Sequence, residues 1–301
     1  MQVGSRTLIM NPASGTGDHA EYVAQKARGK GFAVWRTEGE GDGVELGLRA
    51  AREGVSEVAI AGGDGTINEV LRGLVAGDHL ENVTLSVVPC GTANLLATNL
   101  GVRDVDHGLA LTDRGPIRSI DIGMADGQPF VVSVIAGLPA NASTAASGAL
   151  KERFGTLAFV ITGVQEAVEF EGLNLSVEAE GEGRTEFWEG EAITVLVGNA
   201  RKFVQGGGQA NMEDGLFDVA VVDQMPPSGL VAEAITDRLL GENTDHVTHF
   251  RASEVRIRET SDEPITFSRD GELAEHGALT LVARKQALDI RVGDDYDPTP
   301  V

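Results

Sequence analysis

The chain has 301 residues, of which 42% are hydrophobic and 23% are charged, an ordinary mixture for a folded protein. This composition excludes a chain that is disordered throughout. The 46 acidic residues outnumber the 24 basic ones, which gives a formal net charge of −22 at pH 7. Because so acidic a surface repels nucleic acid, we expect no nucleic-acid partner.

Several features favour a cytoplasmic protein. We expect no signal peptide, and the single cysteine, Cys90, cannot form an intramolecular disulfide. The longest apolar stretch, residues 130–140, is far shorter than the roughly 20 residues that a membrane span needs, so we expect no transmembrane segment. The scarcity of lysine and the acidic runs predict adaptation to a high-salt cytoplasm.

The first 120 residues alternate between strand-like and helix-like patterns. Strands are predicted at 7–10, 32–35, 58–61 and 85–88, and amphipathic helices at 19–28, 44–52 and 67–75. This alternation predicts βαβ units and a mostly parallel, Rossmann-like sheet, in which ligands bind at the carboxyl ends of strands. We therefore predict an α/β nucleotide-binding domain over residues 1–122.

The pattern changes after residue 121. A helix is predicted over about 150–170, and strands at 174–180, 193–197, 217–222, 254–258, 265–267 and 279–282. This arrangement predicts a mainly antiparallel β-sandwich domain over residues 123–284. A last strand at 287–292 could pack on either domain, so the segment from about 285 to 301 is a candidate to return to the first domain.

The first predicted strand leads into Asn11-Pro-Ala-Ser-Gly-Thr-Gly17 and then a helix. Small residues and glycines expose backbone N–H groups, and a helix start adds partial positive charge, so this loop suits a phosphate. The alternative is an ordinary strand-to-helix turn with Ser14 or Asp18 as the N-cap. No Walker A pattern occurs in the chain, so any nucleotide is held in another way.

The third predicted strand ends in Ala61-Gly-Gly-Asp-Gly-Thr-Ile-Asn-Glu69. Three glycines around Asp64 allow a ligand to approach the backbone closely, and the carboxylate could contribute to a Mg²⁺ site. A second reading makes Thr66 and Glu69 a capping box for the next helix. That reading leaves Asp64 and the glycines unexplained, so we predict a functional site here.

The fourth predicted strand ends in Val88-Pro-Cys-Gly-Thr-Ala-Asn94. Thr92 and the Gly91 backbone could contact a phosphate or a ribose. Cys90 has no evident base near it in the sequence, so we interpret it as a small buried hydrophobic residue.

These three motifs, in this order on successive strands, resemble the diacylglycerol kinase catalytic family, and most closely its soluble bacterial and archaeal lipid kinases, which are related to sphingosine and ceramide kinases. The resemblance extends over residues 5–285 and includes Met212-Glu-Asp-Gly-Leu-Phe-Asp218 and Arg269-Asp-Gly-Glu272. It implies an ATP- and Mg²⁺-dependent lipid kinase. The ATP-binding residues it implies are Asn11, Pro12, Ala13, Ser14, Gly15, Thr37, Gly62, Gly63, Asp64, Gly65, Thr66, Asn68, Glu69, Gly91 and Thr92.

The resemblance also implies metal sites and a base. Asp64 would join Asp121 in a carboxylate–water–Mg²⁺ network, and a structural Mg²⁺ would lie at the turn formed by Asn211, Asp214, Leu216 and Asp218. The base would be Asp270 or Glu272, and the sequence does not decide between them. This chain departs from most relatives at Leu95, where they have Asp, so an acidic contribution is missing from that corner.

The expected reaction is transfer of the ATP γ-phosphate to a hydroxyl of diacylglycerol or a related lipid, including an ether-linked one. The lipid would be met in transient association with a membrane surface, and a homodimer is left open. Two alternatives compete: an NAD kinase-type enzyme, which shares Gly-Gly-Asp-Gly, and a catalytically silent nucleotide- or lipid-binding regulator on the same fold.

Overall fold

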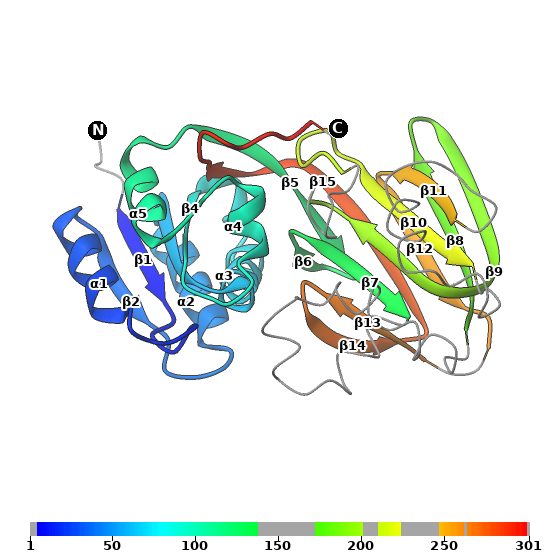
Figure 1. Ribbon diagram of the computed structural model, residues 1–301, viewed down its shortest axis with the longest axis horizontal. Coiled ribbons are helices and arrows are strands. Elements are labelled where there is room, and N and C mark those ends of the chain that lie inside the picture. Colours follow the sequence, from blue (N-terminus) through cyan, green and yellow to red (C-terminus); the bar gives the residue numbers. More distant parts are fainter. Residues whose placement is uncertain (1–4, 138–171, 201–209, 224–246, 262–263, 300–301) are drawn as a thin grey trace. The chain divides into compact units, whose positions relative to one another are not determined.

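The computed structural model describes residues 5–137, 172–200, 210–223, 247–261 and 264–299 (Figure 1). The chain forms two compact units, which divide between Ile122 and Gly123 and again between Lys285 and Gln286. The helix predicted over 150–170 lies outside the described residues. Within the described ranges, none of the helices combines the length and apolar character needed to cross a bilayer.

The first unit is built on parallel strands. Its strands are β1 (Arg6–Met10), β2 (Ala33–Arg36), β3 (Glu57–Gly62) and β4 (Thr84–Pro89), in the order β2-β1-β3-β4, and every one of these pairs is parallel. The carboxyl-terminal end of β15 (Ala278–Arg291) extends this sheet, because Asp289 and Ile290 pair in parallel with Thr84 and Leu85. The predicted α/β class is thereby confirmed for this unit.

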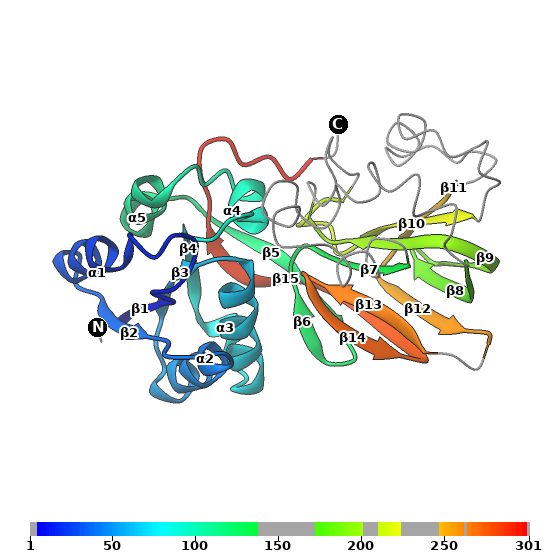
Figure 2. The same ribbon diagram turned by 60° about the horizontal axis from the view of Figure 1, so that its bottom comes forward.

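Helices cover both faces of these strands (Figure 2). They are α1 (Ala20–Gly29), α2 (Asp42–Glu53), α3 (Asp64–Ala76), α4 (Leu95–Asn99) and α5 (Val105–Arg114), with a 3₁₀ turn, η1 (Leu80–Asn82). α1 contacts α5 over one face, where alternate strand residues such as Leu8, Ala59 and Val88 are buried. α2 packs against α3, and that contact depends on Gly47 and Gly73, because a Cβ at Gly73 would lie 2.1 Å from the carbonyl oxygen of Val44.

The described part of the second unit consists of strands. They are β6 (Gln128–Phe130), β7 (Ser133–Gly137), β8 (Leu173–Gly181), β9 (Arg184–Gly198), β10 (Phe217–Asp223), β11 (Val247–Ala252), β12 (Glu254–Glu259), β13 (Ile265–Arg269) and β14 (Glu272–His276), with parts of β5 (Ile117–Ala125) and β15. These strands pair with one another in antiparallel fashion, which confirms the predicted β-sandwich-like class.

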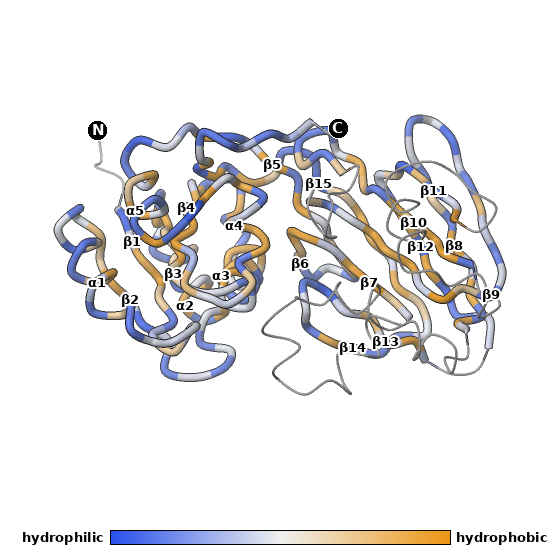
Figure 3. Tube along the Cα trace, in the orientation of Figure 1, coloured by the Kyte–Doolittle hydropathy of each residue, from blue (hydrophilic) through white to orange (hydrophobic). Residues whose placement is uncertain are grey.

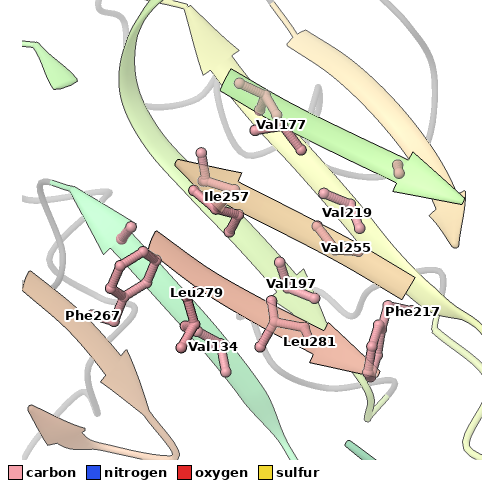
Figure 4. Close-up of a cluster of buried hydrophobic side chains, with 14 of the residues drawn as sticks. Val134, Val177, Val197, Phe217, Val219, Val255, Ile257, Phe267, Leu279 and Leu281 are labelled. Atoms are coloured by element: carbon pink, nitrogen blue, oxygen red, sulfur yellow. The ribbon is translucent and has the colours of Figure 1, made fainter. Parts of the chain in front are cut away.

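Alternating residues of these strands build one hydrophobic core (Figure 4). Phe217 and Phe130 stack in it with ring centroids 5.4 Å apart. Hydrophobic residues, coloured orange in Figure 3, lie along β7 in the second unit and along β3 in the first. Each unit therefore has a core of its own, as expected for a folding domain.

The sequence predicts two separate strands, at 279–282 and 287–292, but the structure has one continuous strand, β15. The polar run Arg284-Lys-Gln286 interrupts the apolar pattern, yet the strand continues through it from Ala278 to Arg291. Gln286 has a positive φ of 50°, and its N–H donates to the Asp121 carboxylate at 2.7 Å. The irregular residue is thus held by a buried carboxylate, which is why hydrophobic periodicity does not detect the continuity.

Candidate functional site

Three loops meet at the carboxyl ends of β1, β3 and β4. The Asn11 N–H donates to the Ala61 carbonyl at 2.9 Å, and its side-chain amide donates to the Thr66 hydroxyl at 3.3 Å. The Cys90 N–H donates to the Gly62 carbonyl at 2.9 Å. These bonds place Pro12, Ala13, Ser14 and Gly15, the Gly62–Asp64 corner, and the Gly91–Thr92 corner around one edge of the sheet.

Glycines let the loops touch. A Cβ on Gly91 would lie 2.4 Å from the Gly63 Cα, so the two backbones approach too closely for side chains. Gly15 has a φ of +57°, and a Cβ there would lie 2.5 Å from the Cys90 carbonyl oxygen. The glycine density in the sequence thus has a physical cause, because a larger residue at either position would force the loops apart.

Asp64 is the first residue of α3, and its carboxylate holds the neighbouring loop. One oxygen accepts the Leu95 N–H at 3.0 Å and the other accepts the Leu96 N–H at 3.1 Å, at the start of α4. Asn94 completes this loop by exchanging two bonds with Gly91, at 2.9 and 2.7 Å. Leu95 contributes its backbone N–H here, so this contact does not need an acidic side chain at position 95.

Glu69 caps a different helix from the one predicted. Its carboxylate accepts the Gly41 N–H at 2.9 Å and the Gly43 N–H at 3.0 Å, at the beginning of α2. The capping-box reading is wrong, because α3 already begins at Asp64 and its N-cap, Gly63, receives no side-chain bond. The prediction that Ser14 or Asp18 is the N-cap of α1 is also wrong. The N-cap is His19, and no side-chain hydrogen bond caps this helix.

The remaining predicted residues of this unit are mostly buried. Thr37 and Asn68 are buried, and the Thr37 N–H donates to the Met10 carbonyl at 2.9 Å. Gly65 is exposed in the first turn of α3. Cys90 lies in the hydrophobic cluster, as predicted, and burial raises the pKa of its thiol to about 12, so it is not a nucleophile at neutral pH.

The carboxylates of the first unit decide whether it could bind Mg²⁺ together with a phosphate. An ionised carboxylate has about four acceptor positions, and the bonds that Asp64 accepts from the Leu95 and Leu96 N–H groups leave room for more. Asp121 is fully buried and accepts the Gln286 N–H. Among the described residues, no three or more His, Cys, Asp or Glu side chains gather as a metal cage. The set therefore fits only a cation that phosphate oxygens and water help to hold.

In the second unit, Asp270 and Gly271 form the two-residue turn between β13 and β14. Their φ angles of 46° and 93° are typical of the Asp-Gly hairpin turn. The Asp270 carboxylate accepts the N–H groups of Val131, Val132 and Ser133 at 2.7, 2.9 and 2.9 Å. Asp270 therefore anchors the beginning of β7.

Glu272 is the first residue of β14 and has a different environment. Its side chain is 36% exposed, and one carboxylate oxygen lies 2.9 Å from the Arg269 guanidinium across the same turn. Both candidates for the base thus flank Gly271. The Asp270 carboxylate is hydrogen-bonded to backbone N–H groups, whereas that of Glu272 is partly exposed to solvent.

The turn before β10 brings Asn211, Asp214 and Leu216 together. One Asp214 oxygen accepts the Leu216 N–H at 2.9 Å, and the other accepts a close bond from the Arg251 guanidinium. Asn211 and Leu216 form an isolated bridge, and Asp218 is buried in β10. This turn as folded does not fit a divalent cation, because Arg251 holds the carboxylate oxygen that such an ion would need.

The fold and these loops define a class of two-unit proteins with glycine-rich loops at one edge of a parallel α/β unit. Residues 5–125 match the model of the diacylglycerol kinase catalytic domain, and residues 132–292 match that of the YegS C-terminal NAD kinase beta sandwich-like domain. The chain belongs to the diacylglycerol kinase catalytic family, with its YegS-like C-terminal domain.

Individual relatives agree with this assignment. The chain is 31% identical to a protein of Pseudomonas putida named "Probable lipid kinase YegS-like", over 84% of this chain and 82% of that one. It is 28% identical to the "Diacylglycerol kinase" of Bacillus subtilis, over 88% of each chain. A crystal structure of a diacylglycerol kinase from Bacillus anthracis, 20% identical, matches with a TM-score of 0.73 over 99% of this chain and all of that one. This last likeness shows the fold.

Proposed function

We propose that the chain is an ATP- and Mg²⁺-dependent lipid kinase that transfers the γ-phosphate to a hydroxyl of diacylglycerol or a related lipid, including an ether-linked one. The observation that carries the proposal is the back-to-back contact of Gly63 and Gly91 at the ends of β3 and β4. Membership of the family supports it, because relatives in that family are named lipid kinases.

In this proposal the loops of the first unit bind the nucleotide. The backbone of residues 11–15, the Gly62–Thr66 corner, Gly91 and Thr92 would contact the phosphates and the sugar, since glycine-rich loops before helices suit anions. Asp64 and Asp121 would hold Mg²⁺ together with phosphate oxygens. When bound, Mg²⁺ would neutralise negative charge on the transferred phosphoryl group, which matters for a chain of net charge −22.

We assign the base to Glu272 rather than Asp270. The Asp270 carboxylate accepts three backbone N–H groups, so moving it onto a substrate proton would break the anchor of β7. Glu272 is partly exposed and is oriented by Arg269. A carboxylate is basic enough for this task, because the lipid hydroxyl loses its proton only as the new P–O bond forms.

The test is transfer of labelled γ-phosphate from Mg·ATP in multimolar KCl, with diacylglycerol, dialkylglycerol and NAD offered separately. Wild type and a Glu275→Gln control, changed at an exposed residue of the same strand, should label a lipid. Glu272→Gln should label it about 10²–10⁴-fold more slowly. Labelled NADP alone would support the NAD kinase reading, and binding of Mg·ATP with no transfer would support the silent regulator.

Adaptation to high salt is part of the same proposal. With 46 acidic residues against 24 basic ones, self-repulsion weakens the folded state at low ionic strength, and salt screens it. The melting temperature should therefore rise from low to multimolar KCl. Equal melting temperatures at the two salt concentrations would remove this part of the proposal.

A further inference from the structure

The turn from Asn211 to Leu216 has two basic side chains against it. The Arg251 guanidinium donates to Asp214 in an ion pair, in which the Asp214 side chain is 25% exposed and that of Arg251 46%. The other Asp214 oxygen accepts the Leu216 N–H at 2.9 Å. Each oxygen of this carboxylate thus has a donor from within the chain.

The register between β10 and β11 determines where Arg251 lies relative to the turn. Asp218 of β10 lies directly opposite Arg251 of β11, and the next pair is Phe217 with Ala252. Phe217 and Ala252 belong to the hydrophobic core, so Asp218 and Arg251 lie on the other face of the strand pair. The backbone of Arg251 is therefore paired with one acidic residue, Asp218, while its guanidinium pairs with another, Asp214.

Lys285 lies against the same turn from β15. Gly215 has a φ of +82°, and a Cβ added to it would be 3.0 Å from the Lys285 Cδ and 3.1 Å from its Cβ. The aliphatic part of Lys285 therefore crosses the glycine, which is buried although it lies in a turn. Lys285, a basic residue of this strongly acidic chain, thus packs against the turn through its aliphatic carbons.

We infer that Arg251, with Lys285 over Gly215, supplies the positive charge at this turn, so that the turn keeps its shape without a bound divalent cation. A dication at Asp214 would have to displace the guanidinium from the carboxylate oxygen and then remain beside two positive side chains. The inference concerns the folding of the second unit and does not depend on the proposed kinase activity.

The experiment compares melting temperatures in EDTA and in a MgCl₂ titration, with ionic strength held constant by KCl. The variants are wild type, Arg251→Gln, Arg251→Gln with Asp214→Asn, and Arg256→Gln. Arg256 is the matched control, because it also pairs with carboxylates, those of Glu178 and Glu254, on a neighbouring part of the same unit.

Wild type and Arg256→Gln should show no saturable rise with Mg²⁺. Arg251→Gln should melt lower in EDTA and gain about 5 °C or more as Mg²⁺ occupies the vacated carboxylate, a gain that the added Asp214→Asn should remove. A saturable rise in wild type that Asp214→Asn abolishes would overturn the inference, as would an Arg251→Gln variant that folds and does not respond to Mg²⁺.

If Arg251→Gln does not fold, Mn²⁺ binding to wild type and Asp214→Asn, followed by electron paramagnetic resonance, takes its place. Equal numbers of bound Mn²⁺ ions in the two proteins are expected. Loss of one tight site in Asp214→Asn would contradict the inference.

Discussion

The carboxylates of the sequence motifs have different hydrogen-bond partners in the two units. In the parallel unit, Asp64 and Glu69 both belong to α3, and each accepts two N–H groups at the beginning of another helix, α4 or α2. In the antiparallel unit, Asp270 accepts three N–H groups that lead into a strand, and Asp214 pairs with a guanidinium.

The difference follows from the supply of donors. The start of a helix leaves N–H groups without intrahelical partners, and in a βαβ unit several such starts lie at one edge of the sheet. A carboxylate on one loop can therefore bind its neighbour. Among the described residues of the second unit the elements are strands, so its carboxylates take donors from turns, strand entries and arginine. Acidic motif residues thus hold together the loops of the candidate functional site.

The strongest structural perturbation expected in the first unit is Gly91→Ala. Its Cβ would lie 2.4 Å from the Gly63 Cα, where neither backbone can yield easily, so we expect a loss of about 1–3 kcal/mol and weaker ATP binding. Urea unfolding and ATP titration measure the two effects. Gly29→Ala, at the end of α1, is the control, because an added Cβ there meets nothing within 4 Å, and it should leave both quantities nearly unchanged.

Glu69→Ala should lower stability by a similar amount, with its effect confined to the start of one helix. The change leaves the Gly41 and Gly43 N–H groups without their acceptor at a helix whose N-cap offers no side-chain bond, so we expect a loss of about 1–3 kcal/mol. Hydrogen exchange at residues 41–44 should accelerate. Glu45→Ala, at an exposed position in the first turn of the same helix, should leave exchange at these residues slow.

The smallest effect concerns Cys90 and alkaline pH. Burial raises the pKa of its thiol to about 12, above that of an unfolded thiol near 8.5, so the folded state keeps a proton that the unfolded state loses. Stability should therefore decline as the pH rises from about 8.5 towards 12. Cys90→Ala should show less of this decline in urea unfolding, and an identical pH profile in the two proteins would contradict the assignment.

Much of the first unit could be predicted from sequence. Predicted strands and helices agree with the structure to within a few residues, because apolar periodicity reports which face each element buries. The largest shift is at α3, which begins at Asp64, three residues before its predicted start. There Gly65, one of the glycines that mark the loop, also belongs to the first turn of the helix.

The sequence pattern does not predict strands β5, β6, β7, β11 and β14. β14 is Glu-Leu-Ala-Glu-His, mostly exposed, and its conformation depends on pairing with β13 and on the Asp270-Gly271 turn. The role of Arg251 had no local signal, since it contacts Asp214 from 37 residues away through the register of β10 and β11. Contacts set by strand register cannot be read from periodicity.

The most direct test of the division of roles in the second unit compares Asp270→Asn with Glu272→Gln, each measured for unfolding free energy and for phosphate transfer per folded molecule. Asp270→Asn should lose about 1–3 kcal/mol of stability, because an amide group would face backbone N–H donors, and its folded fraction should retain transfer. Glu272→Gln should keep its stability and lose transfer. The opposite pattern, a stable but inactive Asp270→Asn beside an active Glu272→Gln, would contradict the assignment of Asp270 as an anchor and Glu272 as the base.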